Sequence, residues 1–262
     1  MSKGLVFVMA LVLALGPSVR HAAAQDPTAS EILKKCDLAE GYRSAYMHLD
    51  QTITTSSGAK RTLEIRGWSI DNGDKQLSEY LAPSDIKGQK ILMTEDGDNI
   101  WMFNPETRRV RKLGSHMKKK KVMGSDFTYE DQAGGKISEK YTGDLVGVET
   151  QDGVECYVLE LKPTPKGPSY DKIKAWIAKE DHVTRRVDFY QDGQDKPFKR
   201  LVSSDVRKVE YLDKGQKAVK IVPFKLVMTN LEDRTETVNL TKDIRYGVKI
   251  PGSIFNPRKL KS

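Results

Sequence analysis

Apolar and polar residues alternate with a period of two along most of the chain after His48. Such alternation is typical of strands that bury one face. Turn dipeptides such as Asn72-Gly73 and Asp152-Gly153 separate the runs, and these residues accept the positive φ angles of tight hairpins. The pattern therefore predicts a meandering antiparallel sheet. Its expected strands are Thr62–Ile70, Lys90–Met93, Asn99–Asn104, Gly153–Lys162, Ile173–Ala178, Thr184–Tyr190, Lys217–Thr229 and Glu236–Tyr246.

One segment, Thr28 through His48, has the helical period instead. Ser30 is its expected N-cap. Gly41 is a poor helix former, so the sequence leaves the end of this helix open. The apolar stripe of the expected helix consists of Ile32, Leu33, Cys36, Leu38 and Ala39.

The first expected strand departs from simple alternation. Leu63 and Ile65 share one parity, whereas Trp68 and Ile70 have the opposite parity. An extra residue near Gly67 would return all four side chains to one face. The pattern therefore predicts a β-bulge near Gly67 and a curved sheet.

Residues 1–24 have the parts of a secretory signal peptide. Lys3 supplies the positive charge, Leu5 to Leu15 form an apolar run, and small residues precede the expected cleavage site. The run is too short to span about 30 Å of hydrocarbon as a helix. We expect cleavage between Ala24 and Gln25, export to the periplasm, and a single domain over residues 25–262.

An oxidising compartment permits a disulfide between the two cysteines, Cys36 and Cys156. Two separate buried thiols fit the sequence equally well. Cys156 begins a run, ending at Leu161, that is apolar at both parities. Such a strand is expected to be covered on both faces, by a helix on one side and a cavity on the other.

The formal net charge of +8 falls to about +6 when Lys3 and Arg20 leave with the signal peptide. A basic protein favours acidic partners, including anionic lipid headgroups, and export argues against nucleic acid. The charge is concentrated in one stretch, which we call the basic cluster and expect to dock on headgroups or a partner protein. A solvated loop is the alternative. Its members are Arg108, Arg109, Arg111, Lys118, Lys119, Lys120 and Lys121.

The patterns of common enzymes and metal sites do not occur. Gly134-Gly135-Lys136 lacks the other residues of a phosphate loop, and His48, His116 and His182 have no metal-ligand spacing. Three carboxylates lie within Met123–Asp131, but no nucleophile or metal partner accompanies them. Asp and Ser near Gly more often form hydrogen bonds within turns. We therefore expect no catalytic residue, no metal and no cofactor.

Several segments together resemble a known family. Ile100–Pro105, Arg108–Arg111 and Met123–Asp131 (Met-Gly-Ser-Asp-Phe-Thr-Tyr-Glu-Asp) are the most specific. They resemble the bacterial outer membrane lipoprotein-sorting proteins, a periplasmic LolA/LolB-like family, and the resemblance extends over the whole mature chain. Further matching segments are Pro83–Gly88, Tyr170–Ile177, Thr237–Leu240 and Ile250–Phe255.

The resemblance implies a mostly β fold of the α+β class. We expect a half-open, curved antiparallel β-barrel of about 10–11 strands, with an N-terminal helix and short lid helices. Its cavity would hold acyl chains of lipoproteins or other lipids, hopanoid-like lipids included, for transfer toward the outer membrane. The implied partners are an RND-family exporter or an outer-membrane acceptor. The alternative function is that of an RseB-like sensor or scaffold, which binds a lipidated ligand and signals to a membrane partner.

Large apolar residues are the expected lining of this cavity. Trp101 and Phe103 share one parity of their strand and Met102 has the other, so the three cannot all face the same space. Plain core packing is the alternative for each residue. The expected lining consists of Trp68, Trp101, Met102, Phe103 and Phe127.

Overall fold

A computed structural model of the protein describes residues 26–261. The predicted signal peptide and its cleavage site lie outside these residues. None of the helices in the described range is both long and apolar enough to cross a membrane. The helices are α1 (Ala29–Glu40), α2 (Tyr129–Gln132) and α3 (Ile137–Lys140), with short 3₁₀ helices at Asp71–Gly73, Ser115–Lys119, Gly252–Phe255 and Pro257–Lys259.

In residues 26–261, 13 strands form one antiparallel sheet that does not close into a barrel. The prediction of a mostly β, half-open fold with an N-terminal helix is confirmed, with more strands than the expected 10–11. The strands are β1 (Ser44–Thr54), β2 (Lys60–Ile70), β3 (Lys75–Ala82), β4 (Lys90–Thr94), β5 (Asn99–Asn104), β6 (Arg109–Lys112), β7 (Tyr141–Gln151), β8 (Val154–Pro163), β9 (Lys172–Ala178), β10 (Thr184–Tyr190), β11 (Lys199–Asp213), β12 (Gln216–Asn230) and β13 (Thr235–Tyr246).

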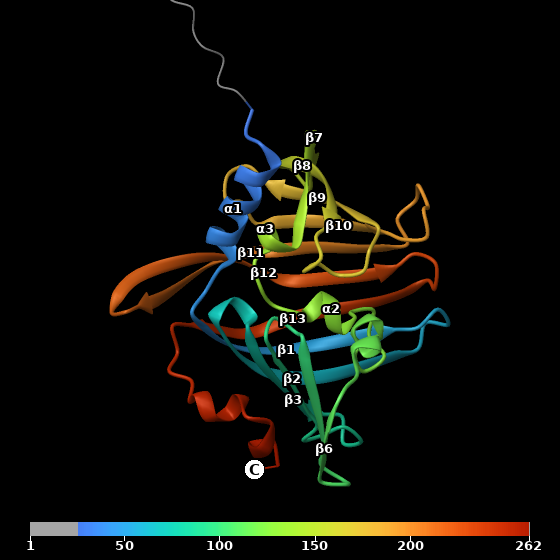
Figure 1. Cartoon of the computed structure of the whole chain (residues 1–262), viewed down its shortest axis with the longest axis vertical. Coiled ribbons are helices and arrows are strands. Elements are labelled where there is room, and N and C mark those ends of the chain that lie inside the picture. Colours follow the sequence, from blue (N-terminus) through green and yellow to red (C-terminus); the bar gives the residue numbers. More distant parts are fainter. Residues whose placement is uncertain (1–25, 262) are drawn as a thin grey trace, which may run out of the picture.

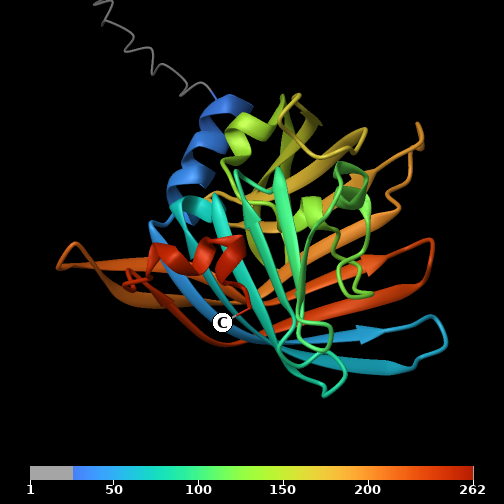
Figure 2. The ribbon, with the colours of Figure 1, turned by 60° about the horizontal axis from the view of Figure 1, so that its bottom comes forward.

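The order of the strands sends one connection across the whole sheet. β6 and β7 follow each other in the chain but form opposite edges, because β1 pairs with β13 in the middle. Residues 113–140 join these edges and contain α2 and α3, which lie within the curve of the sheet (Figures 1 and 2). We call residues 113–140 the crossover segment.

Tight turns join several neighbouring strands as the sequence predicts. Asp152-Gly153 links β7 to β8, and Lys214-Gly215 links β11 to β12. All four residues have positive φ, at 49° and 81° in the first turn and 51° and 85° in the second. These values are those of the two-residue turns that match the twist of paired strands.

The N-terminal helix is shorter than predicted. Thr28 is its N-cap, not Ser30, and forms a capping box with Glu31. The helix ends before Gly41, whose N–H donates to the carbonyl of Asp37. The predicted extension to His48 is wrong, because that stretch enters β1, which gains backbone hydrogen bonds from both β2 and β13.

Two apolar clusters share the concave face of the sheet. Ile53, Thr237 and Met228 lie directly opposite one another on β1, β13 and β12, so their side chains point to the same side. Ile53 belongs to the cluster of β1–β5, and Met228 to the cluster of α1 and β8–β12. The crossover segment supplies Tyr129 to the first cluster and Phe127 to the second. It therefore bridges the two halves of the interior.

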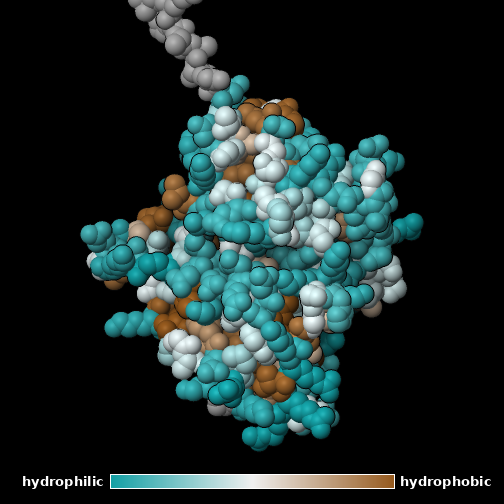
Figure 3. All heavy atoms as spheres, in the orientation of Figure 1, coloured by the Kyte–Doolittle hydropathy of each residue, from teal (hydrophilic) through white to brown (hydrophobic). Residues whose placement is uncertain are grey.

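The C-terminal segment, residues 250–260, covers part of the convex face. Leu77 pairs with Trp68 on β2 and with Leu92 on β4, and Leu92 pairs with Trp101 on β5. These four side chains form one cluster with apolar residues of the C-terminal segment. The side of the molecule seen in Figure 3, in the orientation of Figure 1, is mostly hydrophilic, and its hydrophobic residues gather in a few patches.

The parity change within β2 results from a change of covered face. Leu63 packs in the concave cluster, whereas Trp68 packs in the convex one. The pairing of β2 with β1 continues past Gly67 without a shift, and the shift in its pairing with β3 lies between Glu64 and Ile65. The predicted bulge near Gly67 is therefore wrong.

Cys36 and Cys156 are both free and buried. Cys36 packs in the concave cluster with Leu159, whereas Cys156 packs with Trp176 in a small cluster of its own. Cys156 and Leu159 have opposite parity on β8, so the strand separates the two thiols. The disulfide that the sequence allowed is not formed. Both faces of the strand are buried, as predicted, but the predicted cavity on the face opposite the helix is wrong, because the cavity lies on the same concave side as α1.

The convex cluster gives a first prediction. Leu260 is 1% exposed, so Leu260→Ala should lower the free energy of unfolding by about 2–5 kcal/mol through lost contacts and the cavity left behind. Leu212 is 59% exposed, and Leu212→Ala should change this free energy by less than about 0.5 kcal/mol. Urea denaturation measures both values. Equal unfolding midpoints for Leu260→Ala and the unmodified protein would contradict the packing role of the C-terminal segment.

Candidate functional site

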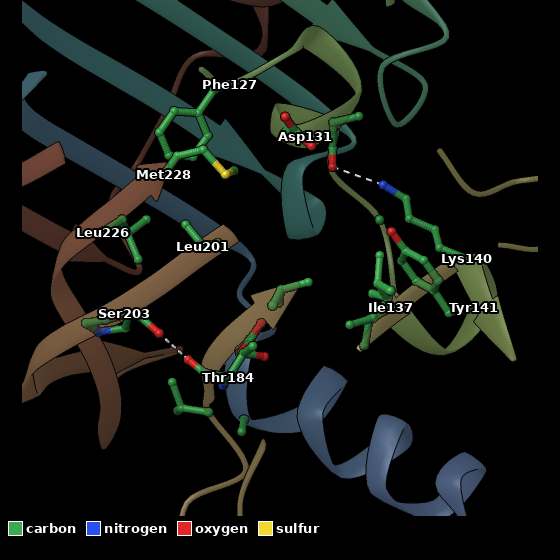
Figure 4. A pocket seen from close by; sticks show the side chains of 18 of the residues that line it. Phe127, Asp131, Ile137, Lys140, Tyr141, Thr184, Leu201, Ser203, Leu226 and Met228 are labelled. Atoms are coloured by element: carbon green, nitrogen blue, oxygen red, sulfur yellow. Dashed lines mark hydrogen bonds between the residues drawn. The ribbon is translucent and has the colours of Figure 1, made fainter. Parts of the chain in front are cut away.

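A cavity of about 450 Å³ lies on the concave face, between strands β9–β12, the crossover segment and the C-terminal end of α1 (Figure 4). Its volume falls within the range of about 300–1,000 Å³ typical of ligand pockets. Most of its walls are apolar. The apolar lining includes Phe127, Ile137, Ile173, Val187, Phe189, Leu201, Val222, Leu226 and Met228.

Strand register aligns these side chains into one wall. Leu201 of β11 lies opposite both Val187 of β10 and Met228 of β12, and Leu226 lies opposite Ser203. Directly paired residues share a face, so the apolar positions of three strands meet on the concave side. Phe127 reaches the same space from the crossover segment (Figure 4).

A buried carboxylate fastens the crossover segment to the middle of the sheet. The side chain of Asp126 is 1% exposed. Its Oδ1 accepts hydrogen bonds from Thr235 Oγ1 at 2.5 Å and Lys121 Nζ at 3.2 Å, and its Oδ2 accepts one from Thr237 Oγ1 at 2.9 Å. The backbone N–H of Asp126 donates to Thr237 Oγ1 at 2.8 Å. The Gly-Ser-Asp part of the recognised segment is therefore an anchor on β13.

A second buried anchor joins α2 to β11. Lys199 Nζ lies 2.7 Å from Asp131 Oδ2, and the two side chains are 3% and 5% exposed. Tyr170 donates to Asp131 Oδ1 at 2.6 Å and accepts from Lys199 at 2.5 Å. The ammonium also lies 4.7–5.8 Å from the ring centres of Tyr170, Phe189 and Phe198. Burial raises the pKa of Tyr170, which favours its role as a hydrogen-bond donor here.

Ionisable groups lie among the apolar walls. Lys140 Nζ donates to the carbonyl of Ala133 at 2.9 Å, and burial lowers the pKa of this lysine. Glu40, at the end of α1, accepts hydrogen bonds from Thr184, and burial raises the pKa of its carboxyl group. In both cases the loss of water destabilises the charged form. The cavity therefore has polar attachment points on apolar walls.

The predicted lining residues fall into different places. Phe127 lines the observed cavity. Trp68, Trp101 and Phe103 belong to the convex cluster under the C-terminal segment. Met102 pairs with a residue of the concave cluster, in the half of the interior outside the cavity. The parity argument thus separated Met102 from Trp101 and Phe103 correctly, but four of the five residues have no place on this cavity.

The basic cluster extends from the turn before β6 through β6, which is one edge of the sheet, into the start of the crossover segment. Lys118 pairs with Asp98 at 2.6 Å, and Lys121 pairs with Asp126 and Asp233 at 3.2 and 2.9 Å. The remaining members are exposed, and the ion pairs of residues 26–261 do not include them. They are Arg108, Arg109, Arg111, Lys119 and Lys120.

Sequence reasoning missed the partners that hold the crossover segment. Lys199 is flanked by basic and aromatic residues that gave no signal of burial. Tyr170 and Thr237, however, begin two of the segments that resemble the lipoprotein-sorting family. Each contacts the Met123–Asp131 segment, so the matching segments meet in space.

Comparison with known proteins assigns the chain to a family. A family model described as "Uncharacterized protein" matches residues 72–262. The chain belongs to this family. No curated protein sequence matches it.

Solved structures extend the comparison over most of the chain. A domain from Vibrio parahaemolyticus described as outer membrane lipoprotein-sorting has 26% identity and a TM-score of 0.79, over 89% of this chain and 98% of that one. A DUF1329 family protein from Desulfovibrio piger has 23% identity and a TM-score of 0.76, over 88% and 97%. A LolA superfamily protein from Nitrosomonas europaea has 20% identity and a TM-score of 0.70, over 88% and 98%. The resemblance to lipoprotein-sorting proteins and the LolA-like fold are therefore confirmed.

The second anchor gives a prediction for stability. Lys199→Met leaves the Asp131 carboxylate buried without its cation, so the free energy of unfolding should fall by about 3–5 kcal/mol. Adding Asp131→Asn should restore part of this loss. Lys118→Met removes an exposed partner and should cost at most about 1 kcal/mol. Chemical denaturation of Lys199→Met, Asp131→Asn and the double variant completes a double-mutant cycle, with Lys118→Met as control, and an additive cycle would show that the two charges are not coupled.

Proposed function

We propose that the protein is a periplasmic carrier, which holds acyl chains of lipoproteins or other lipids in the cavity and moves them toward the outer membrane. The apolar cavity of about 450 Å³ under the crossover segment carries the proposal. The structural similarity to a domain described as lipoprotein-sorting supports it. The alternation along β10–β12 explains why these strands supply a wall suited to a hydrocarbon chain.

The physical need for such a carrier is large. Each methylene group of an acyl chain gains about 0.8 kcal/mol on leaving water, so a bare 16-carbon chain loses on the order of 10 kcal/mol in an aqueous compartment. An apolar cavity returns much of that free energy. Met228 in its wall has a flexible side chain that adapts to different chain shapes.

Export and partners form the rest of the proposal. The signal-peptide pattern of residues 1–24 supports a periplasmic location. The exposed members of the basic cluster are a suitable docking surface for anionic headgroups, for an RND-family exporter or for an outer-membrane acceptor.

Substitution in the cavity wall tests the carrier proposal. Leu226→Gln places an amide against the chain, so affinity for a fluorescent acyl probe should fall about tenfold or more. Leu226 is only partly buried, so the melting temperature should change little. Leu240→Gln makes the same change at an exposed site of β13 and should bind like the unmodified protein. Equal affinity of all three proteins would contradict acyl binding at this wall.

Charge removal tests the docking surface. The double variant Lys119→Gln/Lys120→Gln should bind phosphatidylglycerol vesicles less than the unmodified protein, by about 1 kcal/mol per lysine. The difference should fade as salt shortens the screening length from about 10 Å at 0.1 M. Lys214→Gln/Lys217→Gln changes the net charge equally on the β11–β12 hairpin and serves as control. Co-sedimentation in which both double variants behave alike would show that location of charge is irrelevant.

A further inference from the structure

The end of the cavity beside α1 combines one acid and one base. Glu40 is the last residue of α1, and Lys220 projects from β12 into the same cavity. Thr184 of β10 and Tyr246 of β13 also contribute to this end.

Only one carboxylate oxygen of Glu40 forms hydrogen bonds within the described residues. Its Oε1 accepts hydrogen bonds from Thr184 N and Oγ1, both at 3.1 Å, and from Cys36 Sγ at 3.6 Å. The hydrogen bonds of the described residues leave Oε2 without a donor. The side chain lines the cavity, and desolvation in the cavity wall raises the pKa of the carboxyl group. One carboxylate oxygen is therefore free to accept a hydrogen bond from a ligand.

Lys220 also uses only part of its hydrogen-bonding capacity. Its side chain is buried, and Nζ donates to the carbonyl of Ala39 at 2.6 Å, one of the carbonyls that the end of α1 leaves unpaired. Burial lowers the pKa of Lys220, and the charge of Glu40 opposes this shift. Among residues 26–261, however, the ion pairs within 4.0 Å do not include Glu40 with Lys220. An ammonium group has three donors, so Nζ retains hydrogen-bonding capacity toward the cavity.

We propose that Glu40 and Lys220 form a subsite for a hydroxyl group carried by an amphipathic ligand. The inference rests on the proposed function, because it assumes that the cavity holds the apolar part of that ligand. A hydroxyl group is both donor and acceptor, so it donates to Glu40 Oε2 and accepts from Lys220 Nζ. The hydroxyl group thereby links two side chains that form no ion pair with each other.

Charged ligand ends fit this subsite less well. A carboxylate or phosphate pairs with Lys220 but meets the like charge of Glu40, and an ammonium group has the reverse conflict with Lys220. A ligand end without polar atoms removes water from both groups and replaces none of the hydrogen bonds. The pair therefore selects a neutral hydroxyl over ions of either sign and over hydrocarbon.

Four probes with the same chain test this selection: dodecanol, methyl dodecyl ether, dodecanoate and dodecylammonium. Each competes with a bound fluorescent acyl probe. The ether accepts but does not donate a hydrogen bond, so dodecanol should bind the unmodified protein about tenfold more tightly. Dodecanol should also bind more tightly than both ionic probes.

Two variants should change the order of the ionic probes in opposite directions. Glu40→Gln removes the negative charge, so dodecanoate should gain about tenfold over dodecylammonium. Lys220→Met removes the positive charge and should favour dodecylammonium. Glu64→Gln and Lys242→Met make matching changes at an ion pair of β2 and β13 outside the cavity lining, and they should leave the order unchanged. Glu40→Gln keeps an oxygen that accepts the hydrogen bonds of Thr184, so this variant should preserve the local structure. It therefore tests the subsite even if Lys220→Met destabilises the end of α1.

The outcomes separate the subsite from the carrier proposal. Failure of every probe to displace the fluorescent acyl chain, or of that chain to bind, contradicts the proposed function itself. Binding of all four probes with the same order in the unmodified protein, Glu40→Gln and Lys220→Met overturns the hydroxyl subsite and leaves the acyl cavity in place.

Discussion

The buried carboxylate of Asp126 is the constraint on which the concave face depends. Because β6 and β7 form opposite edges, the crossover segment must pass over the whole sheet, and its polar groups need partners where water is excluded. Asp126 finds them on β13, the strand between the two apolar halves. This contact fixes Phe127 on one half and Tyr129 on the other. The hydrogen bonds of Asp126 thus hold the crossover segment in place between the two apolar clusters.

The position of the cavity depends on where α1 and the anchored crossover segment lie on the concave face. α1 fills the region over β8–β10 with fully buried side chains such as Ile32, and the Asp131–Lys199 pair ties α2 to β11. Between them, apolar side chains of β10–β12 line the cavity. Hydrogen bonds of defined geometry position the crossover segment over the cavity, whereas burial of apolar area forms the wall of β10–β12. An amphiphile adds contacts to this wall and does not need to replace the hydrogen bonds that anchor the crossover segment.

Strands were predictable where one face is buried along their whole length. Asn99–Asn104 and Thr184–Tyr190 have the predicted bounds, because apolar burial imposes their alternation. β11 was not among the expected strands, and its outer half carries exposed side chains at both parities. β1 was missed because its first residues were assigned to the expected helix, and one of its two partners, β13, lies nearly 200 residues later. Local pattern contains no information on such distant hydrogen bonds.

The sequence by itself determined the fold class, the tight turns and the family, because alternation, turn dipeptides and the Met123–Asp131 segment are local features. It also determined that Trp101 and Met102 face opposite sides of their strand. Only the tertiary structure decided which side encloses a cavity. That choice depends on where the crossover segment and the C-terminal segment lie, and hence on the order of the strands. For the same reason Phe127, Glu40 and Lys220, far apart in the chain, share one cavity that periodicity does not reveal.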